Sequence, residues 1–103
     1  MRAGQNKVAP MTVQGKRQLG ARIRQLRLER HLSQERFANM VEMDRGYICG
    51  IERGKKNPSF EKLERIAAGL DVSLSTLLWG VGTSYSEADY EYTRVDWPSP
   101  KQD

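Results

Sequence analysis

The chain has 103 residues, of which 38% are hydrophobic, so it can build one modest core, and a second domain of similar size is excluded. It contains one cysteine and one histidine, so an intramolecular disulfide is impossible, and we expect no metal site and no cofactor. Its 17 Lys and Arg outnumber its 13 Asp and Glu, and the net charge of +4 favours a polyanionic partner such as nucleic acid.

Hydropathy, charge and the positions of glycine and proline divide the chain into segments. No apolar run approaches the roughly 18 residues of a membrane span, and the first residues do not resemble a secretion signal, so we expect a cytoplasmic protein without a membrane partner. Residues 1–15 contain Gly4, Pro10 and Gly15 and predict a flexible N-terminal arm, either an inert leader or an arm that grasps DNA. Residues 16–79 carry 13 basic and eight acidic side chains in short amphipathic segments, whereas residues 80–103 form an acidic, aromatic C-terminal tail.

The first two predicted helices follow from apolar spacing and caps. A helix over residues 16–30 is predicted because apolar residues recur at helical intervals, namely Leu19, Ile23 and Leu26. Ser33 is a suitable N-cap for a second helix over residues 34–41. The inward-facing residues of this second helix are predicted to be Phe37, Ala38 and Val41.

Three further helices are predicted downstream. The third covers residues 45–53, begins after the N-cap candidate Asp44 and ends at Gly54, which can adopt the left-handed conformation that closes helices. Ser59 and Ser73 are N-caps for a fourth and a fifth helix. Their apolar residues at helical spacing are Phe60, Leu63, Ile66, Ala67 and Leu70, then Leu74, Leu77 and Leu78. No segment shows the alternation of apolar and polar residues that is typical of a strand. The predicted fold is therefore all-α, a compact five-helix domain.

The second and third helices, separated by about three residues, form a helix-turn-helix arrangement, in which the second of the two helices enters the DNA major groove. At about 100° per residue, the third helix has one polar or small-residue arc, made of Arg45, Gly46, Cys49, Gly50 and Arg53. Its other side is apolar, with Tyr47, Ile48 and Ile51. This arc is the predicted DNA-facing surface.

Two glycines on this arc are costly, because each destabilises a helix by about 1 kcal/mol relative to alanine. We interpret Gly46 and Gly50 as positions where the backbone approaches base edges closely; the alternative is a weak or bent helix. Cys49 is interpreted as a small residue that faces the groove, with a redox switch as the alternative.

A longer pattern resembles a known family. The segments are Leu32-Ser33-Gln34-Glu35, Phe37-Ala38, residues 47–54, Pro58 and residues 63–70. Together they resemble the Cro and phage-repressor (XRE) type of helix-turn-helix protein over residues 19–78, which implies a lambda-repressor-like fold. Within this family, residues 44–53 look most like the controller proteins of restriction-modification systems.

The resemblance implies a role for each matching position. Gln34 would bond a phosphate and Arg45 would read a guanine. Tyr47 would pack on a thymine methyl group or sugar and meet a phosphate, or else be a half-buried core residue. The implied backbone contacts are Arg53, Lys55 and Lys56, and the implied structural ion pair joins Arg27 to Glu52. His31 and Glu42 depart from the pattern, since glycine is usual at both positions.

The predicted function is a sequence-specific transcriptional regulator that reads double-stranded DNA as a homodimer and is not an enzyme. The candidate dimer interface consists of Leu74, Leu78 and Trp79, which could instead complete the monomer core. The tail contains Tyr85, Tyr90, Tyr92 and Trp97 and is predicted to pack on the body or on a protein partner. The alternative function is therefore an antitoxin or adaptor that binds a protein through this tail.

Overall fold

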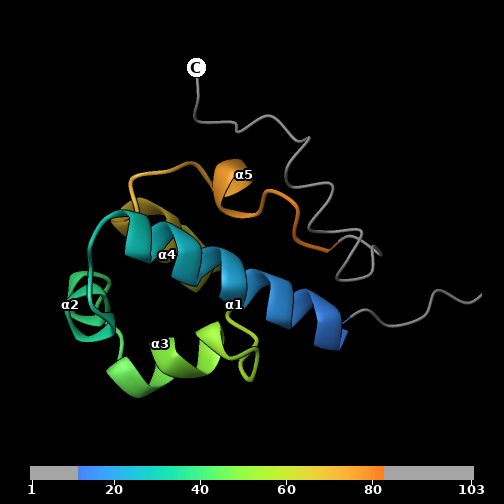
Figure 1. The fold of residues 1–103 in the computed structure, drawn as a ribbon, viewed down its shortest axis with the longest axis horizontal. Coiled ribbons are helices and arrows are strands. Elements are labelled where there is room, and N and C mark those ends of the chain that lie inside the picture. Colours follow the sequence, from blue (N-terminus) through green and yellow to red (C-terminus); the bar gives the residue numbers. More distant parts are fainter. Residues whose placement is uncertain (1–11, 83–103) are drawn as a thin grey trace, which may run out of the picture.

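Five α-helices occur in residues 12–82, the part of the chain that the computed structural model describes (Figure 1). They are α1 (Thr12–Glu29), α2 (Gln34–Met40), α3 (Arg45–Glu52), α4 (Phe60–Gly69) and α5 (Leu74–Leu77). No strand occurs in this range, and the predicted all-α class is confirmed. The long helix α1 runs past the other four, and α2 and α3 meet at one corner of the molecule.

Serine hydroxyls cap the N-termini of three of the helices, as the sequence predicts. The side-chain oxygens of Ser33, Ser59 and Ser73 each accept a hydrogen bond from a backbone N–H in the first turn of the helix that follows. The donors are the N–H groups of Arg36, Lys62 and Thr76. Asp44 precedes α3 in the extended conformation of an N-cap, but its side chain makes no capping bond. The start of α3 is therefore fixed by other contacts.

The prediction for the start of the first helix was wrong by four residues. Helix α1 begins at Thr12, so residues 12–15, which the sequence placed in the flexible arm, are helical. Gly15 was read as punctuation, but one glycine costs a helix only about 1 kcal/mol and does not stop a helix of 18 residues. Residues 1–11 and 83–103, which hold most of the predicted arm and tail, lie outside the described residues.

Side chains from all five helices build one buried core. The predicted inward faces of α1 and α2 and the two isoleucines of α3 are buried, and so are two residues of α4, its C-cap Leu70 and one residue of α5. These residues are Leu19, Ile23, Leu26, Phe37, Ala38, Val41, Ile48, Ile51, Ile66, Ala67, Leu70 and Leu77. Phe60 does not join them, although it follows the apolar period, since it is 61% exposed at the first position of α4.

Helices α1 and α3 pack backbone against backbone at Gly20. A Cβ atom at this position would overlap the carbonyl oxygen of Ile51 and lie 2.6 Å from that of Glu52. Only glycine permits this approach without a shift of the helices. The close contact fixes the end of α3 against the middle of α1.

Four helices end in the same hydrogen-bonded turn, with one residue in the left-handed conformation. That residue is His31 after α1 (φ 56°), Glu42 after α2 (φ 59°), Gly54 after α3 (φ 76°) and Asp71 after α4 (φ 58°). At each, the N–H groups of the left-handed residue and of the residue after it donate back to the last helical turn, as in His31 to Leu28 and Leu32 to Arg27. The glycine usual at positions 31 and 42 would fit this conformation more easily, because a side chain there costs about 1 kcal/mol or more.

Arginine side chains bind further carbonyl groups at helix ends. Arg22 donates to the carbonyl oxygens of Thr76 and Leu77 at 2.7 and 3.3 Å, which ties α1 to α5. Arg65 donates to those of Val41 and Glu42 at 3.0 and 3.2 Å, which ties α4 to the turn after α2. These guanidinium groups satisfy acceptors that a helix leaves unpaired at its C-terminus.

Candidate nucleic-acid interface

One face of helix α3 packs on the core, and the opposite face is exposed to solvent. Ile48 and Ile51 are 0% and 1% exposed, so they set the rotation of the helix about its axis. The opposite arc faces outward: Arg45, Gly46 and Arg53 are exposed, and Cys49 and Gly50 are half-buried. The structure therefore brings the five predicted residues together on one accessible surface beside α2.

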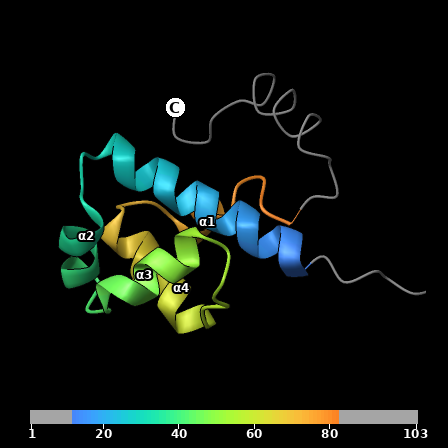
Figure 2. The same cartoon turned by 60° about the horizontal axis from the view of Figure 1, so that its bottom comes forward.

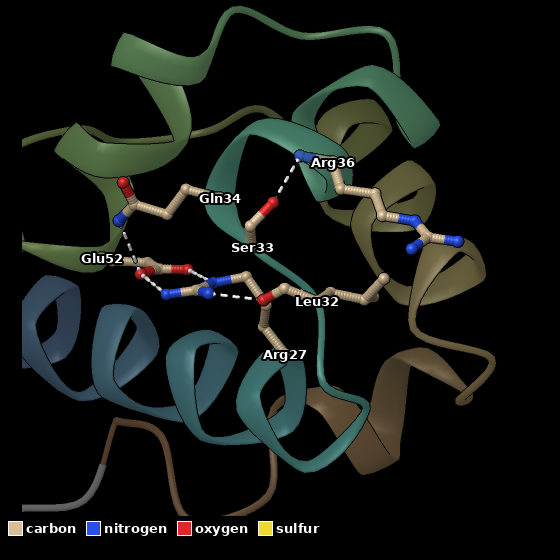
Figure 3. Close-up of polar contacts among 6 residues, drawn as sticks. All are labelled: Arg27, Leu32, Ser33, Gln34, Arg36 and Glu52. Atoms are coloured by element: carbon tan, nitrogen blue, oxygen red, sulfur yellow. Dashed lines mark hydrogen bonds and ion pairs between the residues drawn. The ribbon is translucent and has the colours of Figure 1, made fainter.

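A buried ion pair holds α3 to α1 (Figure 3). Arg27 donates from Nε and Nη2 to the two carboxylate oxygens of Glu52 at 2.7 and 2.9 Å, and from Nη1 to the carbonyl oxygen of Leu32 at 2.7 Å. The two side chains are 7% and 2% exposed. Hydrogen bonding to Glu52 raises the pKa of Arg27, against the opposing effect of burial, so the guanidinium stays protonated at all ordinary pH values.

Gln34 joins this pair from the first position of α2. Its Nε2 donates to Oε1 of Glu52 at 3.0 Å, so one carboxylate connects α1, α2 and α3. The sequence assigned Gln34 to a phosphate, and the structure shows that one amide N–H is already engaged inside the protein. The other N–H is left for an external acceptor.

Tyr47, on α3, has an aromatic ring with two ammonium groups near it. Tyr47 is half-buried, with Nζ of Lys62 4.4 Å and Nζ of Lys56 6.0 Å from the ring centre. Lys62, the third residue of α4, was missed in the sequence, because nothing local marks an α4 residue as a neighbour of Tyr47.

The two glycines of the outward arc differ in their surroundings. A Cβ at Gly46 would have nothing within 4 Å among the described residues, so this position is open. At Gly50 it would lie 2.9, 3.0 and 3.5 Å from Cγ, Cε and Cδ of Lys56, whose stem occupies that space. The space beside Gly50 is therefore filled by the protein itself.

The remaining predicted residues lie at two separate places. Lys55 is exposed in the segment after α3, two residues beyond Arg53 of the outward arc. Leu74, Leu78 and Trp79 lie around α5 and are half-buried, and the two leucines pack against the core. Val81 also packs there, and the N–H of Gly82 donates to Oε1 of Gln18 at 2.7 Å, so the first residues of the predicted tail lie on α1.

Within residues 12–82, no helix has the length and apolarity needed to cross a membrane. The same residues contain no cluster of three or more His, Cys, Asp or Glu side chains that could hold a metal ion.

A comparison with protein families assigns the chain to one of them. A family model described as helix-turn-helix matches residues 23–77, more than half of the sequence. The chain belongs to the helix-turn-helix family of DNA-binding regulators. The XRE-type resemblance, read from segments between residues 32 and 70, is thereby confirmed.

Curated relatives of this helix-turn-helix protein include control protein C.MunI from a Mycoplasma species, 48% identical over 59 residues. The match covers 56% of this chain and 80% of C.MunI. The immunity repressor of Bacillus phage phi105 is 36% identical over 74 residues, which are 72% of this chain and 51% of the repressor.

Among solved structures, the restriction-modification controller C.AhdI from Aeromonas hydrophila is similar, with 37% identity and a TM-score of 0.59. The match covers 60% of the present helix-turn-helix protein and 94% of that controller.

Proposed function

We propose that this chain regulates transcription by reading a specific double-stranded DNA sequence, with α3 in the major groove and two copies bound as a homodimer. The observation that carries the proposal is the two-sided environment of α3, whose buried isoleucines orient an exposed arc of Arg45, Gly46 and Arg53. Named control and repressor proteins among its relatives support regulation as the outcome.

Arg45 is the proposed base-reading residue. It is the first residue of α3 and is exposed, and a guanidinium can donate two parallel hydrogen bonds to O6 and N7 of guanine. Gly46, open beside it, lets the helix backbone approach the base edges. Arg53 and Lys55, at the other end of α3, are proposed to contact phosphates.

Arg45→Ala is expected to weaken binding to the selected DNA sequence about 10- to 100-fold for each bound copy, which corresponds to about 1–3 kcal/mol for a lost bidentate base contact. The sequence would first be selected by the wild-type protein from a random pool of duplexes, and affinities would be measured by fluorescence anisotropy. Because Arg45 is exposed, the melting temperature should be unchanged. A wild-type protein that selects no sequence would refute the proposed function.

Arg45→Lys is the matched control, since it keeps the charge but loses the two parallel donors. We expect this variant to lose discrimination between guanine and other bases while the salt dependence of its binding stays near that of the wild type. Equal binding of guanine and substituted sites by the wild-type protein would contradict base reading by Arg45.

The homodimer is proposed because one eight-residue helix contacts few base pairs, whereas two related copies double the contacts across a symmetric site. Leu74, Leu78 and Trp79, half-buried around α5, supply apolar surface for such an interface. Sedimentation equilibrium should give a dimer, and Trp79→Glu should shift the equilibrium toward monomer without unfolding the chain. A wild-type monomer at high concentration and on DNA would contradict this part of the proposal.

Of two finer biological roles, only that of a controller appears among the names of the relatives. Genes for a methyltransferase and an endonuclease beside this gene would favour a restriction-modification controller. The antitoxin or adaptor alternative depends on the acidic tail, most of which lies outside the described residues, and no observation favours it. We therefore do not propose it.

A further inference from the structure

Tyr47, Lys56 and Lys62 form a cluster at the edge of the proposed reading surface, and we call it the lysine–tyrosine cluster. Its members come from three consecutive parts of the chain: α3, the loop after it, and the first turn of α4. Lys62 Nζ lies 4.4 Å from the ring centre, well inside the range of a cation–π contact, and Lys56 Nζ lies at its outer limit, 6.0 Å. Two ammonium groups thus lie near one aromatic ring.

Lys56 is directed toward this ring by the backbone that precedes it. The N–H of Lys55 donates to the carbonyl oxygen of Gly50 at 2.8 Å, which folds the chain back over the end of α3. The methylene groups of Lys56 then lie in the space that a side chain at position 50 would take. The lack of a side chain at Gly50 therefore makes room for the methylene groups of Lys56, and this packing holds the Lys56 ammonium beside α3.

The two ammonium groups are not neutralised by the surrounding protein. Between residues 12 and 82, no carboxylate lies within ion-pair distance of either lysine. Glu42 and Asp44 line the open groove of about 430 Å³ beside Lys62 and Tyr47, but they remain unpaired with Lys62. Arg65, on the same groove, is engaged by the carbonyl groups of the turn.

Both ammonium groups are positively charged and unpaired, so an anion placed beside the cluster would be attracted to both. The cluster adjoins the outward arc of α3 through Gly50 and Tyr47, which are part of the same helix. A DNA backbone strand that flanks a groove occupied by α3 is an anion of the required kind, because its phosphates follow one another at short intervals.

We propose that Lys56 and Lys62 together contact the phosphates of one DNA backbone strand and that the Tyr47 ring positions both ammonium groups. This proposal rests on the proposed function and deepens it: the DNA-binding surface extends into α4, and Gly50 acts by making room for the Lys56 side chain. Tyr47 is a positioning residue that acts through its ring, and its hydroxyl is dispensable.

The first test measures binding of the full chain to its selected duplex over a series of salt concentrations. Lys62→Gln should lower the slope of log affinity against log salt by about 0.9 for each bound copy, the value for one lost phosphate contact. Lys62→Arg, which keeps the charge and can stack on the ring, should restore the slope. If Lys62→Gln leaves slope and affinity unchanged while the wild type still binds its site, the inference is overturned and the proposed function stands.

The second test separates the Tyr47 ring from its hydroxyl. Tyr47→Phe should bind like the wild type, whereas Tyr47→Leu should weaken binding roughly fivefold, because the ammonium groups lose the ring that positions them. Thermal melting of both variants would verify that the half-buried position still packs. A loss in Tyr47→Phe equal to that in Tyr47→Leu would assign the role to the hydroxyl and overturn the positioning role.

The third test asks what Gly50 does. A methyl group at position 50 must displace the flexible Lys56 stem, so Gly50→Ala should weaken binding in the wild-type background. In a Lys56→Gln background, the same substitution should have little further effect, because the ammonium that it misplaces is already absent. Equal losses of DNA affinity in the two backgrounds would show that Gly50 acts by direct approach to DNA. This result would contradict its role of making room for Lys56. A wild-type chain that selects no DNA would overturn both this inference and the proposed function.

Discussion

Replacing Arg27 by methionine is expected to lower the free energy of unfolding by about 3–5 kcal/mol, the cost of leaving a buried charge without its partner. Glu52 is 2% exposed at its side chain and would keep only the bond from Gln34. The carbonyl oxygen of Leu32 would lose its bond from Arg27 as well. Because the same carboxylate joins three helices, the position of α3 should be disturbed too.

Urea unfolding followed by circular dichroism would measure this loss, with Arg24→Met as the matched control. Arg24 lies on the same helix but is exposed, so its replacement should change stability by no more than about 0.5 kcal/mol. The double variant Arg27→Met with Glu52→Met should recover much of the loss, since it removes both buried charges. Equal effects of Arg27→Met and Arg24→Met would contradict the assignment of a structural role to this pair.

Replacing Gly20 by alanine is expected to destabilise the fold by about 3 kcal/mol, at the upper end of the usual cost of overpacking. The added methyl group would meet carbonyl oxygens of the α3 backbone, and no change of rotamer can move those atoms aside. Helix α1 must therefore shift away from α3, which also stretches the hydrogen bonds between Arg27 and Glu52.

The same substitution five residues earlier should have the opposite sign. A Cβ at Gly15 would have nothing within 4 Å among the described residues, so Gly15→Ala should stabilise α1 by about 0.5–1 kcal/mol through its higher helix propensity. Thermal melts of the two variants, made in parallel, would measure both changes. A Gly20→Ala variant as stable as Gly15→Ala would refute the close packing of α1 on α3.

Much of the fold could be predicted because its signals are local. Serine caps marked the starts of α2, α4 and α5, and α2, α3 and α4 each end two residues before a residue in the left-handed conformation. The start of α1 was misplaced, because a glycine looks the same in a sequence whether it breaks a helix or is tolerated within it. Asp71, the left-handed residue after α4, was missed for a related reason, since a charged residue carries no local mark of that conformation.

The candidate site was predictable only where one helix defines it. The outward arc of α3 follows from its helical phase, and the structure exposes Arg45, Gly46 and Arg53 and half-buries Cys49 and Gly50. The contact of Lys62 with Tyr47 and the filling of the space at Gly50 by Lys56 depend on how the chain returns after α3. The pattern of Gly46 and Gly50 alone could not distinguish an open position from an occupied one.

Four of the arginines in residues 12–82 bind carbonyl oxygens of their own chain: Arg22, Arg27, Arg30 and Arg65. Each still contributes its charge to the field around the molecule, and that field acts on DNA before contact is made. The N–H groups that face those carbonyl oxygens cannot hold a phosphate once DNA has arrived. The overall excess of positive charge should thus govern how fast the protein encounters DNA, whereas the basic side chains that are not engaged within the protein should govern how long the complex lasts.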